Sequence, residues 1–229
     1  MSAGWREGAD DAIAAQARYY DLYAPDYVNP LAPSNRRAPG ILEPTAARDL
    51  IDDLAPEGDV LELACGPGGF TAELARHATT VTAIDASRQM LARNRIEVDL
   101  PNVRYLRTDL FDWRPDATYD VVFFGFWLSH VPPMKFDDFW QLVRTCVRHD
   151  GRVAFVDESD RSMVNDDVRI VEGVPLARRA LADGRALDVV KVFWNPDDLN
   201  ARLCALGWSF SIRRVHDIFM YGVGTSTRA

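Results

Sequence analysis

Hydrophobic and polar positions change their spacing in blocks from about residue 45 onward. Short apolar runs, typical of buried strands, alternate with stretches whose apolar residues recur at helical spacing. Such alternation predicts repeated βα units and a parallel sheet. The expected strands are 59–64, 80–85, 103–107, 119–126 and 151–159, and the expected helices are 45–54, 71–76, 87–95 and 136–147. The run 119–126 is so apolar that we expect a central strand covered on both faces.

The end of the chain has a different pattern. A helix is predicted over 196–206, because Asn195 is a suitable N-cap and Gly207 a suitable terminator. The runs "WSFSIRRV" and "DIFMYGVG" follow, close enough to pair as an antiparallel hairpin. Asp150 and Gly151 are expected to form the turn before the fifth strand. The sequence therefore predicts a mostly parallel seven-stranded sheet that ends in an antiparallel C-terminal hairpin.

The composition limits the classes of partner that the protein could bind. The 229 residues, 48% of them hydrophobic, suffice for one core, and the net charge of −8 disfavours nucleic acid and anionic membranes. The longest apolar run, 121–128, is far short of the roughly 20 residues of a membrane helix, and the N-terminus lacks a signal-peptide pattern, so a cytoplasmic protein is expected. Three cysteines without a CxxC pattern predict neither disulfides nor a metal site.

The stretch "VLELACGPGGF", residues 60–70, is a strand that runs into glycines. A Walker loop would need a lysine after the glycines, and none follows. A dinucleotide fingerprint fits only in part, because Thr71 stands at its third glycine and Pro67 lacks an N–H. The carboxylate of Glu62 would repel a pyrophosphate, but it could accept a hydrogen bond or form an ion pair with a cation. The turn therefore favours a cationic or hydroxyl-rich ligand, with a purely structural bend as the alternative.

Three motifs in order resemble the class I S-adenosylmethionine-dependent methyltransferases over roughly 59–158. The loop "ELACGPGG" is similar to their first motif, with Ala64 where a glycine commonly stands. The resemblance implies a Rossmann-like fold, ribose hydroxyls bound by Asp85, and an adenine amino group bound by Asp109 with the Leu110 backbone. It implies S-adenosylmethionine as cofactor and S-adenosylhomocysteine as product. The cofactor residues that it implies are Tyr20, Tyr27, Glu62, Ala64, Gly66, Gly68, Asp85, Ala86, Met90, Asp109, Leu110, Gly125 and Phe126.

The N-terminal segment "ARYYDLYAPDYV" carries four tyrosines within nine residues. Their spacing is compatible with a core-facing helical stripe. The segment also resembles the lid helix of small-molecule methyltransferases, in which Tyr20 and Tyr27 would reach the methionyl carboxylate. The loop "NPLAPSNRRAPG" that follows is then expected to be a hinge.

The fourth strand ends in "GFWLSHVPP", which is similar to the "HVP" segment of the same superfamily. The resemblance implies that backbone carbonyls around Gly125 and Phe126 accept from the methionyl amine and that Trp127 contacts the acceptor. His130 would be the catalytic base. A structural histidine that holds the loop is the alternative.

Residues 160–195 are expected to form a β-ribbon over the mouth of the site, with a turn at "ADGR". Basic residues gather there, and surface salt bridges to nearby aspartates would explain them without any function. The stretch "ARRALADGRALDVVKVF" resembles small bacterial natural-product O-methyltransferases, including ones that act on phosphonates. In that resemblance Arg179 and Lys191 bind the acid of the substrate.

The predicted organisation is one methyltransferase domain over 1–229. It comprises an N-terminal lid (1–44), a cofactor-binding core (45–158), a substrate-capping insertion (159–195) and a C-terminal helix and hairpin (196–229). The expected activity is methyl transfer from S-adenosylmethionine to an oxygen of a small anionic or hydroxylated metabolite, with a homodimer left open. The alternatives are N- or C-methylation, a non-catalytic S-adenosylmethionine-binding protein and an NAD-dependent dehydrogenase.

Overall fold

The computed structural model describes residues 3–27, 42 and 44–227. Its central sheet has the strand order β3-β2-β1-β4-β5-β10-β9. The bounds are β1 (Asp59–Leu63), β2 (Thr80–Asp85), β3 (Val103–Arg107), β4 (Tyr119–Gly125), β5 (Val147–Glu158), β9 (Trp208–Val215) and β10 (Phe219–Ser226). The strands β1 to β5 are parallel, and β10 lies antiparallel between β5 and β9. The predicted seven-stranded sheet with its antiparallel hairpin is confirmed.

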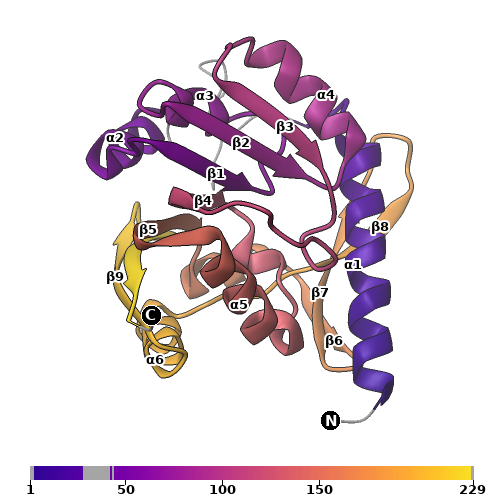
Figure 1. Ribbon diagram of the computed structural model, residues 1–229. Coiled ribbons are helices and arrows are strands. Elements are labelled where there is room, and N and C mark those ends of the chain that lie inside the picture. The colour runs from indigo at the N-terminus through magenta and orange to yellow at the C-terminus, as the bar shows by residue number, and fades with distance from the viewer. Residues whose placement is uncertain (1–2, 28–41, 43, 228–229) are drawn as a thin grey trace.

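Helices cover both faces of this sheet (Figure 1). Residues of α2 (Pro44–Leu54), α3 (Thr71–Ala75) and α4 (Arg88–Glu97) pack on one face, and residues of α5 (Phe136–Cys146) and α6 (Pro196–Ala205) pack on the other. In β4, Val121 and Phe123 face the first group, whereas Val122 and Phe124 face the second. All four are at most 1% exposed. Because successive side chains of a strand point to opposite faces, β4 is apolar throughout, as its sequence predicts.

The turn predicted at Asp150 and Gly151 is wrong, because β5 runs without a break from Val147 to Glu158. Tyr119 is opposite Val147 and Val121 is opposite Arg152, so β5 is irregular over 148–151 relative to β4. A Cβ on Gly151 would lie 2.9 Å from the Asp120 carbonyl oxygen and 3.0 Å from that of Tyr119. The Cβ would also lie 2.8 Å from Val147 Cγ2, so close approach of the β4 backbone and of the Val147 side chain explains the glycine.

The C-terminal elements follow their sequence signals. The side chain of Asn195 accepts a hydrogen bond of 2.9 Å from the Asp197 N–H and one of 3.4 Å from the Asp198 N–H, which satisfies two free donors at the start of α6. Gly207 ends the helix with φ +83°. The predicted helix and hairpin are confirmed, the helix and the first hairpin strand within one residue at their ends and the second hairpin strand within two.

The segment between β5 and α6 forms a separate three-stranded antiparallel sheet. After the 3₁₀ helix η4 (Asp160–Asn165) come β6 (Val168–Val171), β7 (Val174–Ala180) and β8 (Ala186–Val190), in the order β6-β7-β8. This confirms the predicted ribbon, with β6 as an additional strand. Figure 1 shows α1 (Ala3–Tyr23) alongside this ribbon, at the end of the main sheet toward which β1, β2 and β3 point.

The polar side chain of Gln16 joins α1 to β8 and to the segment after β4. Gln16 accepts a 3.1 Å hydrogen bond from the Val190 N–H and donates one of 3.2 Å to the His130 carbonyl oxygen. Two of the four tyrosines, Tyr19 and Tyr23, stack with ring centroids 5.3 Å apart. The expected hinge "NPLAPSNRRAPG" lies outside the described residues. Within the described ranges, none of the helices combines the length and the apolar character that a membrane span requires.

Candidate active site

A pocket opens at the carboxyl ends of β1, β2 and β4, where open α/β sheets bind ligands. Its volume is about 1080 Å³, open solvent included. The lining residues are Ile13, Gln16, Ala17, Tyr20, Tyr27, Glu62, Ala64, Cys65, Gly66, Pro67, Gly69, Phe70, Asp85, Ala86, Ser87, Met90, Asp109, Leu110, Gly125, Phe126, Trp127 and His130. Residues from α1 thus close a pocket whose floor is the main sheet. Twelve of the thirteen predicted cofactor residues line it.

The glycine loop leaves space in this pocket. Gly66 has φ +52°, and a Cβ built on it would meet no atom within 4 Å. A side chain there would therefore extend into open space at a residue that lines the pocket. Ala64 has the same φ of +52°, a region that favours glycine. The departure of Ala64 from the family motif is thus accommodated in a strained conformation, at the end of β1 beside the ligand space.

Gly68 is the one predicted cofactor residue that does not line the pocket. It has φ +100°, and a Cβ there would lie 2.7 Å from Asn94 Oδ1 and 2.8 Å from Val98 Cγ2. Both contacts are at the end of α4. In this structure Gly68 permits the loop to pack against α4.

Asp85 is the last residue of β2, and its carboxylate accepts hydrogen bonds from the neighbouring backbone. One oxygen accepts from the Gly66 N–H at 2.9 Å, and the other accepts from the Ser87 N–H at 2.8 Å. Burial raises the pKa of Asp85 to about 6, while these two hydrogen bonds oppose the rise. At neutral pH the group is therefore mostly ionised and retains acceptor capacity toward the pocket.

Asp109 and Leu110 line the pocket after β3. The Asp109 carboxylate accepts a 2.9 Å hydrogen bond from the Phe111 N–H, and its carbonyl oxygen accepts from Trp113 at 2.9 Å. Leu110 is only 5% exposed. These contacts fix the loop that carries both residues.

Glu62 is a buried carboxyl group in β1, 2% exposed. Thr71 donates a 2.6 Å hydrogen bond to its Oε2, and Asn94 donates one of 2.9 Å to the Thr71 hydroxyl oxygen. Burial raises the pKa of Glu62 to about 8, the Thr71 bond opposes the rise, and the nearby Asp85 adds to it. Glu62 is therefore mostly protonated at neutral pH in this structure.

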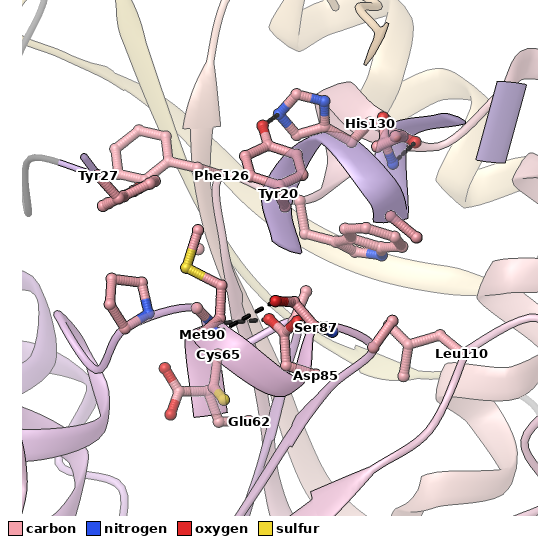
Figure 2. Close-up of a pocket in the computed structure, with 18 of the residues that line it drawn as sticks. Tyr20, Tyr27, Glu62, Cys65, Asp85, Ser87, Met90, Leu110, Phe126 and His130 are labelled. Carbon is pink, nitrogen blue, oxygen red and sulfur yellow. Dashed lines mark hydrogen bonds between the residues drawn. The ribbon is translucent and has the colours of Figure 1, made fainter. Parts of the chain in front are cut away.

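His130 lies in the 3₁₀ helix η2 (Leu128–His130) and is 7% exposed. Its Nδ1 is 2.7 Å from the Val190 carbonyl oxygen. Because a carbonyl only accepts, Nδ1 carries the proton, and Nε2 accepts the 2.8 Å hydrogen bond from the Tyr20 hydroxyl. Figure 2 shows this pair at the opposite end of the pocket from Asp85 and Ser87. Burial, and then the charges of Lys191 and Arg179, lower the pKa of His130 to about 3, so the imidazole is neutral.

The remaining predicted pocket residues come from the segments after α1 and β2, from α4 and from the end of β4. Tyr27 lines the pocket, and Arg93 holds it in place by donating hydrogen bonds to the carbonyl oxygens of Ala24 and Tyr27 at 2.6 and 2.7 Å. Phe126 has φ +55° and donates its N–H to the Val156 carbonyl oxygen at 2.7 Å. Strained conformations after both β1 and β4 thus border the pocket. The other four, Ala86, Met90, Gly125 and Trp127, also line it.

Arg179 and Lys191 do not line this pocket, but both lie close enough to lower the pKa of His130. Their side chains are 33% and 7% exposed, whereas those of Arg169, Arg178 and Arg185 on the same ribbon are all more than half exposed. The three exposed arginines pair with Asp188 or Asp183, as the surface salt-bridge interpretation expects.

Each of the two less exposed cations has a carboxylate partner of its own. Lys191 pairs with Glu158, at the end of β5, and its Nζ is 3.5 Å from the Ser129 hydroxyl oxygen. Arg179 pairs with Asp166. Sequence reasoning included Asp166 only as one of the nearby aspartates that could form surface salt bridges, and it missed Glu158.

Sequence reasoning also missed Gln16 and Asp157. A signal for Gln16 exists, because it is a single polar residue on the apolar face of α1 that holds Ala12 and Tyr19. Asp157 is fully buried and accepts from the Ser129 N–H at 2.9 Å and the Glu158 N–H at 2.7 Å. Burial raises its pKa to about 6, against the opposing charge of Lys191. Among the described residues no cluster of three or more histidine, cysteine or acidic side chains could hold a metal ion.

The fold and the pocket define an α/β protein that binds a nucleoside-like ligand at the ends of parallel strands. Comparison with known proteins identifies its kind. A family model described as a methyltransferase domain matches residues 60–151. The DhpI–SAH complex is 38% identical to this chain, with a TM-score of 0.80, and the match covers 95% of this chain and 98% of DhpI. The DhpI–SAM–HEP complex is 39% identical, with a TM-score of 0.78 and coverage of 98% and 99%.

The chain belongs to the class I S-adenosylmethionine-dependent methyltransferases, and its cofactor is S-adenosylmethionine. The CcbJ methyltransferase from Streptomyces caelestis shares the fold at 16% identity and a TM-score of 0.68, covering 91% of this chain and 97% of CcbJ. Trans-aconitate 2-methyltransferase from Enterobacter sp. (strain 638) is 33% identical over 88 residues, which cover 38% of this chain. That match spans a third of the length of the curated relative.

Proposed function

We propose that this protein transfers a methyl group from S-adenosylmethionine to an oxygen of a small anionic acceptor, leaving S-adenosylhomocysteine. The observation that carries the proposal is the position of Lys191. In a chain with a net charge of −8, this side chain is 7% exposed and lies behind the pocket lining, close enough to His130 to lower the pKa of that residue. Burying a cation is costly, so its retention beside the pocket favours a binding role.

The pocket suits the cofactor chemically. Asp85 would accept the two ribose hydroxyls, and Asp109 would accept from the adenine amino group. Glu62 and the backbone around Gly125 and Phe126, at the ends of β1 and β4, would meet the methionyl amine. We assign Tyr27 to the methionyl carboxylate, whereas Tyr20, predicted to bind the same group, already donates its single O–H to His130 Nε2. The open space beside Gly66 supports binding of the cofactor in this pocket, because a backbone without a side chain allows its close approach.

The acceptor side is assigned to Arg179, Lys191 and Trp127. Bound S-adenosylmethionine supplies an electrophilic methyl carbon, so the protein chiefly has to align the acceptor oxygen with it and exclude water. His130, with a pKa near 3, is a weak base and would orient the acceptor rather than deprotonate an alcohol. An acceptor that arrives ionised fits this state. The presence of both SAM and HEP with the relative DhpI supports a ternary complex of cofactor and small molecule.

A panel of hydroxy acids, dicarboxylates, phosphonates, uncharged phenols and amines tests the proposal, with methyl transfer followed by mass spectrometry. The double variant Arg179→Met, Lys191→Met should raise the KM for acidic acceptors at least tenfold and leave cofactor affinity unchanged, since charge-assisted hydrogen bonds contribute roughly 1.5 to 3 kcal/mol each. Arg178→Met, Arg185→Met is the matched control, because both side chains are exposed. Methylation of uncharged compounds alone, with the double variant as active as wild type, would refute an anionic acceptor.

A second candidate is N-methylation of an amine. It is favoured by the three carboxylates Asp157, Glu158 and Asp166 close to the same cations. Turnover restricted to amines in the same panel would support it over the anionic acceptor.

A further inference from the structure

The contact between Arg179 and Asp166 has the geometry of an arginine that binds an acid ligand. Nη1 of Arg179 donates to Oδ1 of Asp166, and Nη2 donates to Oδ2 at 2.7 Å. Two parallel hydrogen bonds between a planar guanidinium and two oxygens of one acid group are the preferred mode of arginine–carboxylate recognition. An acid in the acceptor would use the same two donors. One acid group therefore already occupies the guanidinium that the proposed function assigns to another.

The two internal carboxylates differ in how firmly they are held. Glu158 is part of β5, where its backbone pairs with Phe219 of β10. Asp166 comes after η4 and before β6, outside any strand. In the part of the chain that the structure describes, both hydrogen bonds of the Asp166 carboxylate go to Arg179. Rotation of this one side chain would release Arg179 without breaking the ribbon.

The number of oxygens makes the exchange selective. The side chain of Asp166 is 12% exposed and that of Arg179 is 33% exposed, so the partly buried guanidinium loses two charge-assisted hydrogen bonds if Asp166 leaves. Only a group that offers two oxygens in the same arrangement restores both hydrogen bonds. A carboxylate or a phosphonate does so, whereas an alkoxide or phenolate oxygen restores one.

We propose that Asp166 is an internal competitor of the acceptor, whose carboxylate an acidic acceptor displaces from Arg179. Asp166 thereby lowers the affinity for all anions and selects acids with two free oxygens over single-oxygen anions. This inference rests on the proposed function, because it requires that Arg179 binds the acceptor. It adds a specificity-determining residue on the segment between β5 and the ribbon.

The test measures anion binding without turnover. Wild type and Asp166→Asn, each saturated with S-adenosylhomocysteine, are titrated with methylphosphonate, succinate and phenol, and binding is followed by calorimetry and by the rise in Tm. Asp166→Asn should bind methylphosphonate and succinate about tenfold more tightly than wild type, because a charged competitor is removed. Phenol should bind equally to both proteins. Asp183→Asn is the matched control, because Asp183 pairs with exposed Arg185 on the same ribbon, and it should match wild type.

The opposite result has a clear meaning. If Asp166 only positions Arg179 for the acceptor, Asp166→Asn will bind both acids more weakly, and Asp166→Glu will restore binding. Weaker or unchanged acid binding in Asp166→Asn overturns the inference. Arg179→Met separates this failure from that of the proposed function. If Arg179→Met weakens acid binding while Asp166→Asn does not tighten it, only the competitor is refuted, whereas no effect of Arg179→Met refutes the assignment of Arg179 itself.

Discussion

Replacing Glu62 by glutamine should stabilise the protein at neutral pH, although Glu62 is one of the residues assigned to the cofactor. The side chain is 2% exposed, and burial raises its pKa from an ordinary 4.5 to about 8. A carboxyl group whose pKa is higher in the folded than in the unfolded protein stabilises the fold only while protonated. Its contribution is complete below about pH 4.5 and is lost as pH rises through about 8.

The size of the effect follows from the difference in proton binding. Between about pH 5 and 7.5 the unfolded protein has lost the Glu62 proton and the folded protein retains it, so the free energy of unfolding falls by about 1.4 kcal/mol per pH unit from this group. At pH 7 the loss amounts to about 3 kcal/mol. Glutamine does not titrate, and its amide oxygen can still accept the hydrogen bond from Thr71.

Urea unfolding of wild type and Glu62→Gln between pH 5 and 8.5 measures this difference. The advantage of the variant should grow with pH and level off above about pH 8. Glu57→Gln, which removes the same charge from an exposed position, should follow wild type. Parallel pH profiles for wild type and Glu62→Gln would show that Glu62 titrates as an ordinary glutamate and would refute the reasoning.

Three further predictions concern the pocket. Asp85→Ala should weaken S-adenosylmethionine binding by about 2 to 4 kcal/mol in calorimetry. The affinity of wild type should fall as the pH drops below about 6, because protonation removes an acceptor from Asp85. If neither the substitution nor the lower pH changes the affinity, Asp85 does not bind the ribose. Tyr27→Phe should raise the Kd of the cofactor with little change in Tm, whereas an unchanged Kd would leave Tyr27 a packing residue. Gln16→Leu should lower the free energy of unfolding by roughly 1 to 3 kcal/mol, because the Val190 N–H and the His130 carbonyl oxygen lose their partner. Urea unfolding measures this change, and a stability equal to that of wild type would contradict the prediction.

The sheet could be predicted because its signals are local. Each signal lies within a few residues of the element that it predicts. Examples are the alternation of Val121 to Phe124 between two faces, the Asn195 cap and the Gly207 terminator. Gly151 shows the limit of this reasoning. Its neighbours along the chain indicate a turn, but a side chain there would meet the backbone of β4, about thirty residues away, as well as Val147. Contact with a distant strand favours glycine at this position, and the local sequence pattern carries no information about that contact.

The candidate site likewise contains residues that could be predicted from local signals and residues that could not. The loop containing Gly66 and the carboxylates Asp85 and Asp109 follow strands in a fixed order, so their meeting at one edge follows from the topology. The partners of Arg179 and Lys191 could not be predicted, because every aspartate and glutamate nearby in sequence is a candidate until the ribbon register is known. The low pKa of His130 likewise depends on burial by α1 and on two cations from the ribbon.

The proposed reactants carry opposite charges, and the side chains between their sites are neutral. The sulfonium cofactor would lie near Asp85 and Glu62, and the acidic acceptor near Arg179 and Lys191. Tyr20 and His130 separate the two groups, joined by a hydrogen bond of 2.8 Å. A protonated imidazole here would repel the sulfonium, and an ionised tyrosine would repel the acceptor. Burial prevents both, since it lowers the pKa of His130 to about 3 and raises that of Tyr20 well above its usual range. The pair therefore contributes hydrogen bonds without charge at the place where donor and acceptor would meet.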